Sequence, residues 1–341
     1  MNKALAGILA ILCAPFAAYA QAFLAGHLTS RDVHIDVPLS NICVEAFDRG
    51  NFVGPMLFPV VPVAKQSGNF YVIGKNQWLR IPQSTVRAPK TSPRRVEFNV
   101  SSDTYNAINY ALAGENAFEV LDAADNAIAL RARTARKVLS DLMMDMEVRI
   151  ANKCTSITNL GSGVSLTGTN KWSDYVNSDP IGDVSTGHAF IRNNTGVVAN
   201  TMLMDWDTHK TLRRHPVLLD MYKYTQGGLL NDAELKEVFE VENLIVSRAI
   251  RNAALEGGTA SIVNVWGNNM LLAHVQPGQG METVTFGLGF RYQPAGFPAP
   301  FAASVYNDPD PGKKTEIVEV GYFQDEKIVA QQLSYLVGST L

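Results

Sequence analysis

Residues 117–153, AFEVLDAADNAIALRARTARKVLSDLMMDMEVRIANK, carry the strongest helical pattern in this chain. Apolar side chains recur at helical spacing on one face, namely Leu121, Ala124, Ile128, Ala135, Val138, Leu142, Met146 and Ile150. Asn116, followed three residues later by Glu119, predicts a capping-box-like start. At 1.5 Å per residue the helix is a rod of roughly 50 Å. We therefore predict one long helix that acts as a structural spine.

The segment before this helix predicts a long β-hairpin. Residues 68–81 are rich in aromatic and β-branched side chains, and Val96, Phe98 and Val100 alternate with polar partners. The linking stretch is polar, broken by prolines, and basic, with Arg80, Arg87, Lys90, Arg94 and Arg95. An isolated two-stranded hairpin is marginal in water, so we expect it to rest on another surface, such as a neighbouring subunit.

The basic tip does not have the pattern of a nucleic-acid site. Such a site needs aromatic side chains between the basic ones for base stacking, and only Trp78 is near. The pattern favours a solvated loop or contact with an acidic partner. Upstream, residues 28–55 predict an extended arm with a short helix at 40–49. Pro59 and Pro62 predict an extended or edge segment at 58–63.

The rest of the chain mixes helices and strands. We predict a loop at 155–170 and helices at 179–193, 208–224 and 232–239, with Pro180 in the first turn of the first of them. Strands are predicted at 199–207, 242–250, 261–267 and 269–275, and the last hundred residues are strand-rich. No regular βαβ alternation occurs, which predicts the α+β class.

Composition describes a folded protein without a general attraction for nucleic acid. The 341 residues are 46% hydrophobic and 18% charged, with a net charge of −3 from 29 basic and 32 acidic residues. Cys13, Cys43 and Cys154 form no recognisable disulfide or zinc framework. Beyond the first residues, no apolar stretch is long enough to span a bilayer.

Searches for catalytic motifs return weak candidates. Asp205, Asp207 and His209, with His215 nearby, suit a divalent metal or acid–base pair, or simply the start of a helix, and we favour the helix start. Residues 161–168, GSGVSLTG, have Thr167 where a nucleophile elbow needs glycine. Gly287 and Gly289 lack the third glycine of a dinucleotide fingerprint and predict a bulge or strand crossing, where backbones approach closely. We predict no catalytic residues, no cofactor and no metal site.

Several segments, taken in order, resemble the major capsid proteins of tailed bacteriophages of the Hong Kong 97 type. They are FPVVPVAKQSGNFYVIGKNQWLR (58–80), RAPKTSPRRVEFNVSSDTYNAINYAL (87–112), LMMDMEVRIANK (142–153), the stretch 215–254, VWGNNMLLAHV (265–275) and EIVEVGYFQDEKIVAQQLSYLV (316–337). Together they cover about residues 28–340. No single short motif is decisive, but the ordered set is fairly specific.

The resemblance implies the architecture of the chain. It implies an apolar leader-like segment (1–27), an N-terminal arm (28–64), an extended loop (65–113), a peripheral domain with the spine helix (114–200), an apical domain (201–300) and returning C-terminal strands (301–341). It implies copies that form hexamers and pentamers of an icosahedral head around double-stranded DNA. Contacts between subunits are expected from the arm and loop, at Phe58, Val60, Lys75, Trp78, Arg80, Arg87, Arg94 and Arg95.

The resemblance also implies partners and location. We expect a portal protein, a separate scaffolding protein, a decoration protein in some members, and packaged DNA bound without sequence specificity. No membrane partner is expected. The location is the virion, after assembly in the host cytoplasm. Rival hypotheses are an encapsulin-like nanocompartment, an exported periplasmic protein, and a metal-dependent hydrolase built on Asp205, Asp207 and His209.

The first 22 residues look like an export signal. Lys3 gives a positive start, residues 4–16 an apolar core, and Ala18-Tyr19-Ala20 a cleavage-like motif. An exported shell subunit would be lost to genome packaging, so we expect residues 1–27 to be retained as an arm that packs inside the particle or against a neighbouring subunit. Cleavage as a short propeptide is the alternative, and an intact mass starting at Gln21 would support it.

Overall fold

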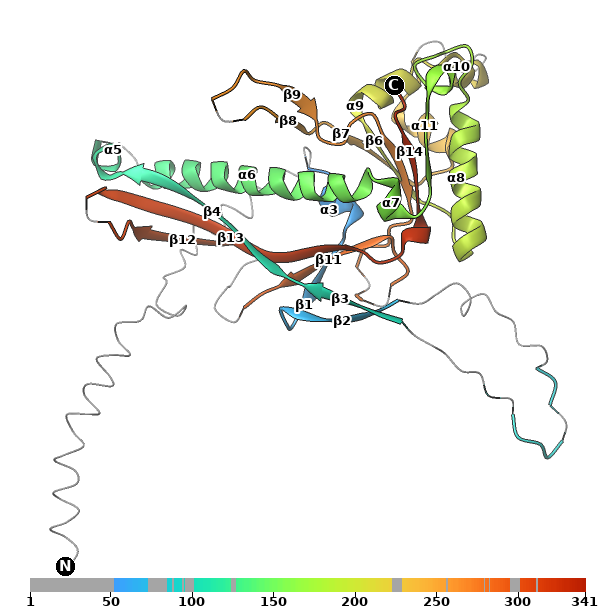
Figure 1. Ribbon diagram of the computed structural model, residues 1–341, viewed down its shortest axis with the longest axis horizontal. Coiled ribbons are helices and arrows are strands. Elements are labelled where there is room, and N and C mark those ends of the chain that lie inside the picture. The colour runs from blue at the N-terminus through green and yellow to red at the C-terminus, as the bar shows by residue number, and fades with distance from the viewer. Residues whose placement is uncertain are drawn as a thin grey trace, which may run out of the picture. The chain divides into compact units, whose positions relative to one another are not determined.

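A computed structural model describes residues 52–72, 85–87, 89–93, 95, 101–123, 127–222, 229–255, 257–278, 280–281, 283–294, 301–310 and 312–341 (Figure 1). The chain divides into two compact units. The first contains Met1–Val44, Ala113–Val138 and Pro294–Val320, and the second contains Glu45–Leu112, Leu139–Gln293 and Gly321–Leu341. The predicted leader, most of the predicted arm and its short helix lie outside the described residues.

One sheet of the second unit has the strand order β5-β14-β10-β6-β7. The strands are β5 (Gly163–Ser165), β6 (Thr201–Asp205), β7 (Asn243–Ser247), β10 (Met270–Ala273) and β14 (Ser334–Gly338). β10 is antiparallel to β14 and β6, whereas β7 is parallel to β6 and β5 to β14. Every residue of β6, β10 and β14 is buried, so these strands form the core of this sheet.

Helix α8 (Pro180–Thr195) packs against β14, as Figure 1 shows. Asp179 caps it by accepting from the Gly182 amide, and Pro180 opens it, which confirms this predicted helix. Gly187 permits the close approach: a Cβ there would lie 2.7 Å from a Leu272 methyl and 2.8 Å from the Tyr335 ring. The absence of a side chain thus sets how closely the helix approaches the sheet.

Three short helices follow around β6 and β7: α9 (Trp206–Leu212), α10 (Pro216–Met221) and α11 (Asp232–Val238). The single helix predicted at 208–224 is wrong, because the chain leaves the helix before Pro216, whose missing N–H and ring disfavour a continuous helix. The capping box of Asn231 and Glu234 starts α11.

The second large sheet has the order β1-β11-β13-β12, with β4 also paired to β13. Its strands are β1 (Val60–Val63), β4 (Ile108–Ala117), β11 (Gly287–Tyr292), β12 (Ala302–Asn307) and β13 (Thr315–Ile328). β1 is an edge strand parallel to β11, as the two prolines predicted. A Cβ on Gly287 would lie 2.6 Å from the Phe58 ring, so a side chain and not the predicted backbone approaches this glycine. At Gly289 the backbone does approach, because a Cβ there would lie 3.3 Å from the Phe58 carbonyl oxygen.

Two separate hairpins complete the sheets. β2 (Ser67–Val72) pairs antiparallel with β3 (Ser101–Asn106), and β8 (Ile250–Asn252) pairs antiparallel with β9 (Ile262–Asn264). Short helical turns are α3 (Gly54–Leu57), α7 (Ile157–Leu160), η1 (Gly168–Asn170) and η2 (Gln331–Leu333). The β2–β3 pair is the base of the predicted long hairpin.

The spine is described as α5 (Phe118–Ala123) and α6 (Ala127–Cys154), and 28 residues give α6 a length of about 42 Å. Most of the predicted apolar face is buried, including Leu121, Ala135, Val138, Leu142, Met146 and Ile150. Among the described members of this face, Ile128 is the exception at 68% exposed, and Ala124 lies outside the described residues. The Asn116 cap is also wrong: Asn116 lies near the end of β4, and its Oδ1 accepts from Thr134 Oγ at 2.8 Å.

The loop predicted at 155–170 is partly wrong, because residues 163–165 form strand β5. Local sequence does not favour a strand there; pairing with β14 does, since Leu336, Val337 and Gly338 align with Gly163, Val164 and Ser165. Across the described residues helices and strands are interspersed, which confirms the α+β class. No helix in this part of the chain is both long and apolar enough for a membrane span.

Candidate functional site

Within the second unit, aromatic packing holds the base of the long hairpin against β1 and β11. Phe70 and Tyr105, one from each strand, are buried in a cluster with Val61, Val63, Leu288 and Phe290. The Tyr105 ring stacks on Phe290 at 4.6 Å, and Phe70 lies 5.1 Å from the same ring. On the opposite face Tyr71 is 67% exposed. The base is therefore anchored on one face and open on the other.

Apart from Phe58, the predicted contact residues divide into three groups. Val60 is 40% exposed in edge strand β1, and Arg87 and Arg95 are exposed in the stretch between β2 and β3. Arg87 Nε donates to the Thr91 carbonyl at 2.5 Å, which closes the tip locally. The third group, Lys75, Trp78, Arg80 and Arg94, lies outside the described residues.

Phe58 requires a correction. Its side chain is 0% exposed and packs edge-on against Phe286, with ring centroids 5.6 Å apart. A side chain in the core of its own subunit has no surface for a neighbour, so Phe58 supports β1 from within and is removed from the contact set. Its sequence context, an apolar residue beside two prolines, did not distinguish these roles.

Val60 also lines a groove of about 570 Å³ between the two edge strands β1 and β7. Its apolar lining includes Met56, Pro59, Leu244 and Ile245. Met56 is 45% exposed beside Val60. Pro59 and Pro62 lack N–H groups, so the β1 edge offers few donors to a further strand. The groove therefore suits side-chain packing better than strand addition.

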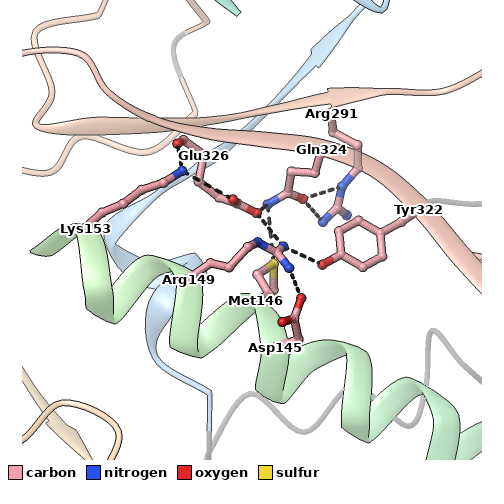
Figure 2. Close-up of polar contacts among 8 residues, drawn as sticks. All are labelled: Asp145, Met146, Arg149, Lys153, Arg291, Tyr322, Gln324 and Glu326. Atoms are coloured by element: carbon pink, nitrogen blue, oxygen red, sulfur yellow. Dashed lines mark hydrogen bonds and ion pairs between the residues drawn. The ribbon is translucent and has the colours of Figure 1, made fainter. Parts of the chain in front are cut away.

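A polar cluster joins the C-terminal half of α6 to β11 and β13 (Figure 2). Arg149 donates to the Tyr322 hydroxyl at 3.0 Å and to Glu326 at 3.2 Å, and it pairs with Asp145. Lys153 Nζ lies 3.7 Å from the Glu326 carboxylate. Further members are Gln324, which donates to Glu326 at 3.2 Å, and Arg291, which donates to Gln324. The helix is thus bonded to the long strand through a carboxylate that is 1% exposed.

The cluster shifts the pKa values of its members. Burial raises the pKa of Tyr322 to about 12, although the neighbouring Arg149 charge acts in the opposite direction. Burial alone would lower the pKa of Arg149, but Tyr322 and Glu326 outweigh it and raise that pKa. Burial lowers the pKa of Arg291. Near neutral pH the cluster therefore contains a charged Arg149 and a neutral Tyr322.

Replacing Arg149 with methionine is expected to lower the free energy of unfolding by about 2–3 kcal/mol, because Glu326 loses its closest cation while remaining buried. Urea unfolding of the purified subunit measures this. The double variant Arg149→Met with Glu326→Gln should recover part of the loss, since the buried side chain at position 326 then carries no charge. Equal stability of Arg149→Met and the parent chain would contradict the structural role.

Glu147 joins three distant segments and was not singled out from the sequence. Its carboxylate accepts from the backbone amides of Val53 at 3.2 Å and Gly54 at 2.7 Å, and from Trp266 Nε1 at 2.6 Å. The residue is 0% exposed. Burial raises the pKa of Glu147, and the three hydrogen bonds oppose the rise. A glutamate on the apolar face of a helix, between Met143 and Ile150, is the signal that was available.

In the first unit, α6 is also bonded to β13 through an arginine and a glutamate. Arg131 donates through Nε and Nη2 to both oxygens of Glu316, at 2.7 and 2.6 Å. This bidentate geometry ties the start of α6 to β13 within the unit. Each unit thus bonds its own part of α6 to its own part of β13.

The acidic and histidine candidates have partners within the fold. Asp205 caps α9 by accepting from the Asp207 amide at 3.2 Å, and Asn264 Nδ2 donates to both carboxylates. His209 bonds Asp232 at 2.8 Å, and His215 bonds Ser178 at 2.9 Å. Burial raises the pKa of Asp205 and lowers that of His215. Within the described residues, no group of three or more His, Cys, Asp or Glu is placed to hold a metal.

Comparison with known proteins finds phage relatives. The chain is 29% identical over 260 residues to the major capsid protein of Burkholderia phage BcepMu, covering 74% of this chain and 80% of that protein. It is 26% identical over 239 residues to the major capsid protein of Pseudomonas phage JBD67, covering 68% of this chain and 74% of that one. No family model matches.

Solved structures extend the likeness. A phage-related protein from Bordetella bronchiseptica RB50 has a TM-score of 0.71 at 25% identity, covering 90% of this chain and 98% of that one. The capsid of cyanophage P-SCSP1u has a TM-score of 0.51 at 11% identity, covering 83% of this chain and 86% of that one. A virus-like particle from Pyrococcus furiosus has a TM-score of 0.51 at 12% identity, covering 88% of this chain and 97% of that one. The last two bear on the fold alone.

Proposed function

We propose that copies of this chain, a phage major capsid protein with the Hong Kong 97-type fold, build the icosahedral head of a tailed bacteriophage around its double-stranded DNA. The copies form a homo-oligomeric shell, and the protein resides in the virion. Hexamers and pentamers are the building blocks. The curated relatives are phage capsid proteins, so the nanocompartment alternative is not favoured.

The observation that carries the assembly role is the hairpin. Phe70 and Tyr105 fasten its base to the subunit, while the described residues of the stretch between the strands, 85–87, 89–93 and 95, are exposed. Three of these exposed residues are basic: Arg87, Lys90 and Arg95. A hairpin whose base is packed on its own subunit, and whose described tip residues are exposed, is suited to lie over an adjoining copy. Val60 and the groove beside it supply apolar contact surface on the subunit body.

The remaining parts of the proposal follow the sequence resemblance. The segments 1–27, 28–64, 65–113, 114–200, 201–300 and 301–341 act as leader, arm, loop, peripheral domain, apical domain and returning strands. Assembly takes place in the host cytoplasm with a portal protein and a separate scaffolding protein, and a decoration protein is a further candidate partner. The packaged DNA is held without sequence specificity, consistent with a net charge of −3. We assign the chain a structural and not a catalytic role.

Negative-stain electron microscopy of the purified full chain tests this function. Closed isometric particles or ring-shaped capsomers are expected at high protein concentration, with or without the scaffolding protein. A compact monomer under all these conditions, confirmed by light scattering, would overturn the proposal. The same micrographs separate it from the exported-protein hypothesis, which predicts a monomer or small oligomer.

A further inference from the structure

The β8–β9 hairpin exposes large apolar side chains on a small support. Ile250 lies opposite Asn264, and Asn252 opposite Ile262. Because side chains alternate along a strand, Ile250 and Ile262 share one face of the hairpin, where they are 54% and 61% exposed. Leu255, beyond the end of β8, is 88% exposed. These side chains form an apolar surface open to solvent.

This hairpin has little support of its own. Among the described strands, β8 and β9 pair with each other and with no third strand. Asn264 fixes the base to α9 through its bonds to Asp205 and Asp207 at 2.8 and 3.0 Å. A two-stranded sheet needs further strands or a packing surface to be stable in water. We therefore expect another surface to cover this hairpin, because it has no third strand among those described and because its apolar side chains are exposed.

The charges of the hairpin indicate what that surface carries. Arg248 and Arg251 are exposed, and the Arg248 guanidinium lies 4.8 Å from the centre of the Trp206 ring. Arg251 stands opposite Val263, so these two side chains lie on the other face of the hairpin from Ile250 and Ile262. Of these two arginines, Arg248 is therefore the one that can accompany the apolar face, and a matching partner surface has apolar side chains next to a carboxylate.

Helix α5 has this composition. Within its sequence FEVLDA, Glu119, Val120 and Asp122 all reach the surface, and Val120 is 54% exposed. Glu119 is the acidic neighbour of Val120, whereas Asp122 lies on the other side of the helix, since successive residues are about 100° apart. Glu119 therefore complements Arg248 of the hairpin. The pair of surfaces is complementary in charge and in exposed apolar area.

We propose that the β8–β9 hairpin of one copy docks on α5 of a second copy. Leu255, Ile250 and Ile262 cover Val120, and Arg248 faces Glu119. This contact rests on the proposed shell function, which surrounds each subunit with copies of itself. It is separate from the β2–β3 hairpin and adds a second inter-subunit contact.

Disulfide trapping tests the contact. Cys13 and Cys43 are replaced by serine, and the buried Cys154 is kept. Two differently tagged chains, one with Leu255→Cys and one with Val120→Cys, are co-expressed, assembled and mildly oxidised. We expect a disulfide-linked dimer at least about tenfold more abundant than with a control pair, Leu255→Cys and Val176→Cys. Val176 is 88% exposed, so the control thiol is at least as accessible as one at position 120.

The outcomes separate this inference from the shell function. Particles that lack the disulfide between positions 255 and 120, or that show equal linking of the control pair, would overturn the docking and leave the function standing. The specific link without closed particles would support the docking and count against the function. Absence of both the link and the particles would refute both.

Discussion

Replacing Glu147 by leucine is expected to lower the free energy of unfolding of the subunit by about 3–5 kcal/mol, the largest effect of any single change considered. The substitution leaves the amides of Val53 and Gly54 and the Trp266 indole without an acceptor in a fully buried site. Each such donor costs about 1–3 kcal/mol when unsatisfied. Urea unfolding of the unassembled subunit measures the loss.

Two variants control this result. Glu147→Gln keeps an acceptor oxygen for Trp266 and Val53 but turns an amide group toward the Gly54 N–H, so a smaller loss of about 1–3 kcal/mol is expected. Arg136→Leu changes an exposed charged residue of the same helix to the same new side chain and should cost less than about 0.5 kcal/mol. Similar losses for Glu147→Leu and Arg136→Leu would refute the buried anchor.

The pKa of Glu147 also predicts how the stability difference between the parent chain and the Glu147→Gln variant depends on pH. Its folded-state pKa lies above the ordinary value, so ionisation is harder in the folded chain than in the unfolded chain. The stability contributed by this group is therefore fully present below the ordinary pKa and declines as the pH rises through the raised one. The stability of the parent chain relative to Glu147→Gln should fall over that window. A stability difference between the two proteins that does not change with pH would contradict burial of the Glu147 carboxylate.

The sequence predicted the elements whose signal is local. The apolar face of the spine, the edge character of β1 and the Asp179–Pro180 start of α8 follow from periodicity, missing N–H groups and capping. Ile128 shows the limit of periodicity, because the pattern gives the direction of a helix face but not what covers each residue. Pro216 indicates the break between α9 and α10, and the prediction of a continuous helix gave this proline too little weight.

The parts that could not be predicted depend on partners far along the chain. Strand β5 forms in a glycine-rich segment because β14, about 170 residues later, offers an unpaired edge. Glu147 is bonded to Gly54 and Trp266, at sequence separations of 93 and 119 residues. Phe58 illustrates the same limit for the candidate site, since only the position of Phe286 and Gly287 decides that its ring faces inward.

Shortening the long hairpin is expected to abolish shells while leaving the subunit folded. In this variant residues 73–100 are replaced by a short linker of glycine and serine, and β2 and β3 are kept. The base retains Phe70 and Tyr105 against Phe290, so the apolar cluster under it is unchanged. A shorter connection also closes at lower entropic cost, by about 0.6 kcal/mol for each halving of its length.

The expected pattern is therefore a thermal midpoint equal to or above that of the parent chain, together with the loss of particles in negative-stain images. This combination distinguishes an assembly element from a folding element, because a hairpin needed for folding would lower the midpoint. Closed particles of ordinary size from the shortened chain would show that residues 73–100 are dispensable for assembly. In that case contact between copies would rest on the body of the subunit, at Val60, the groove beside it and the β8–β9 hairpin.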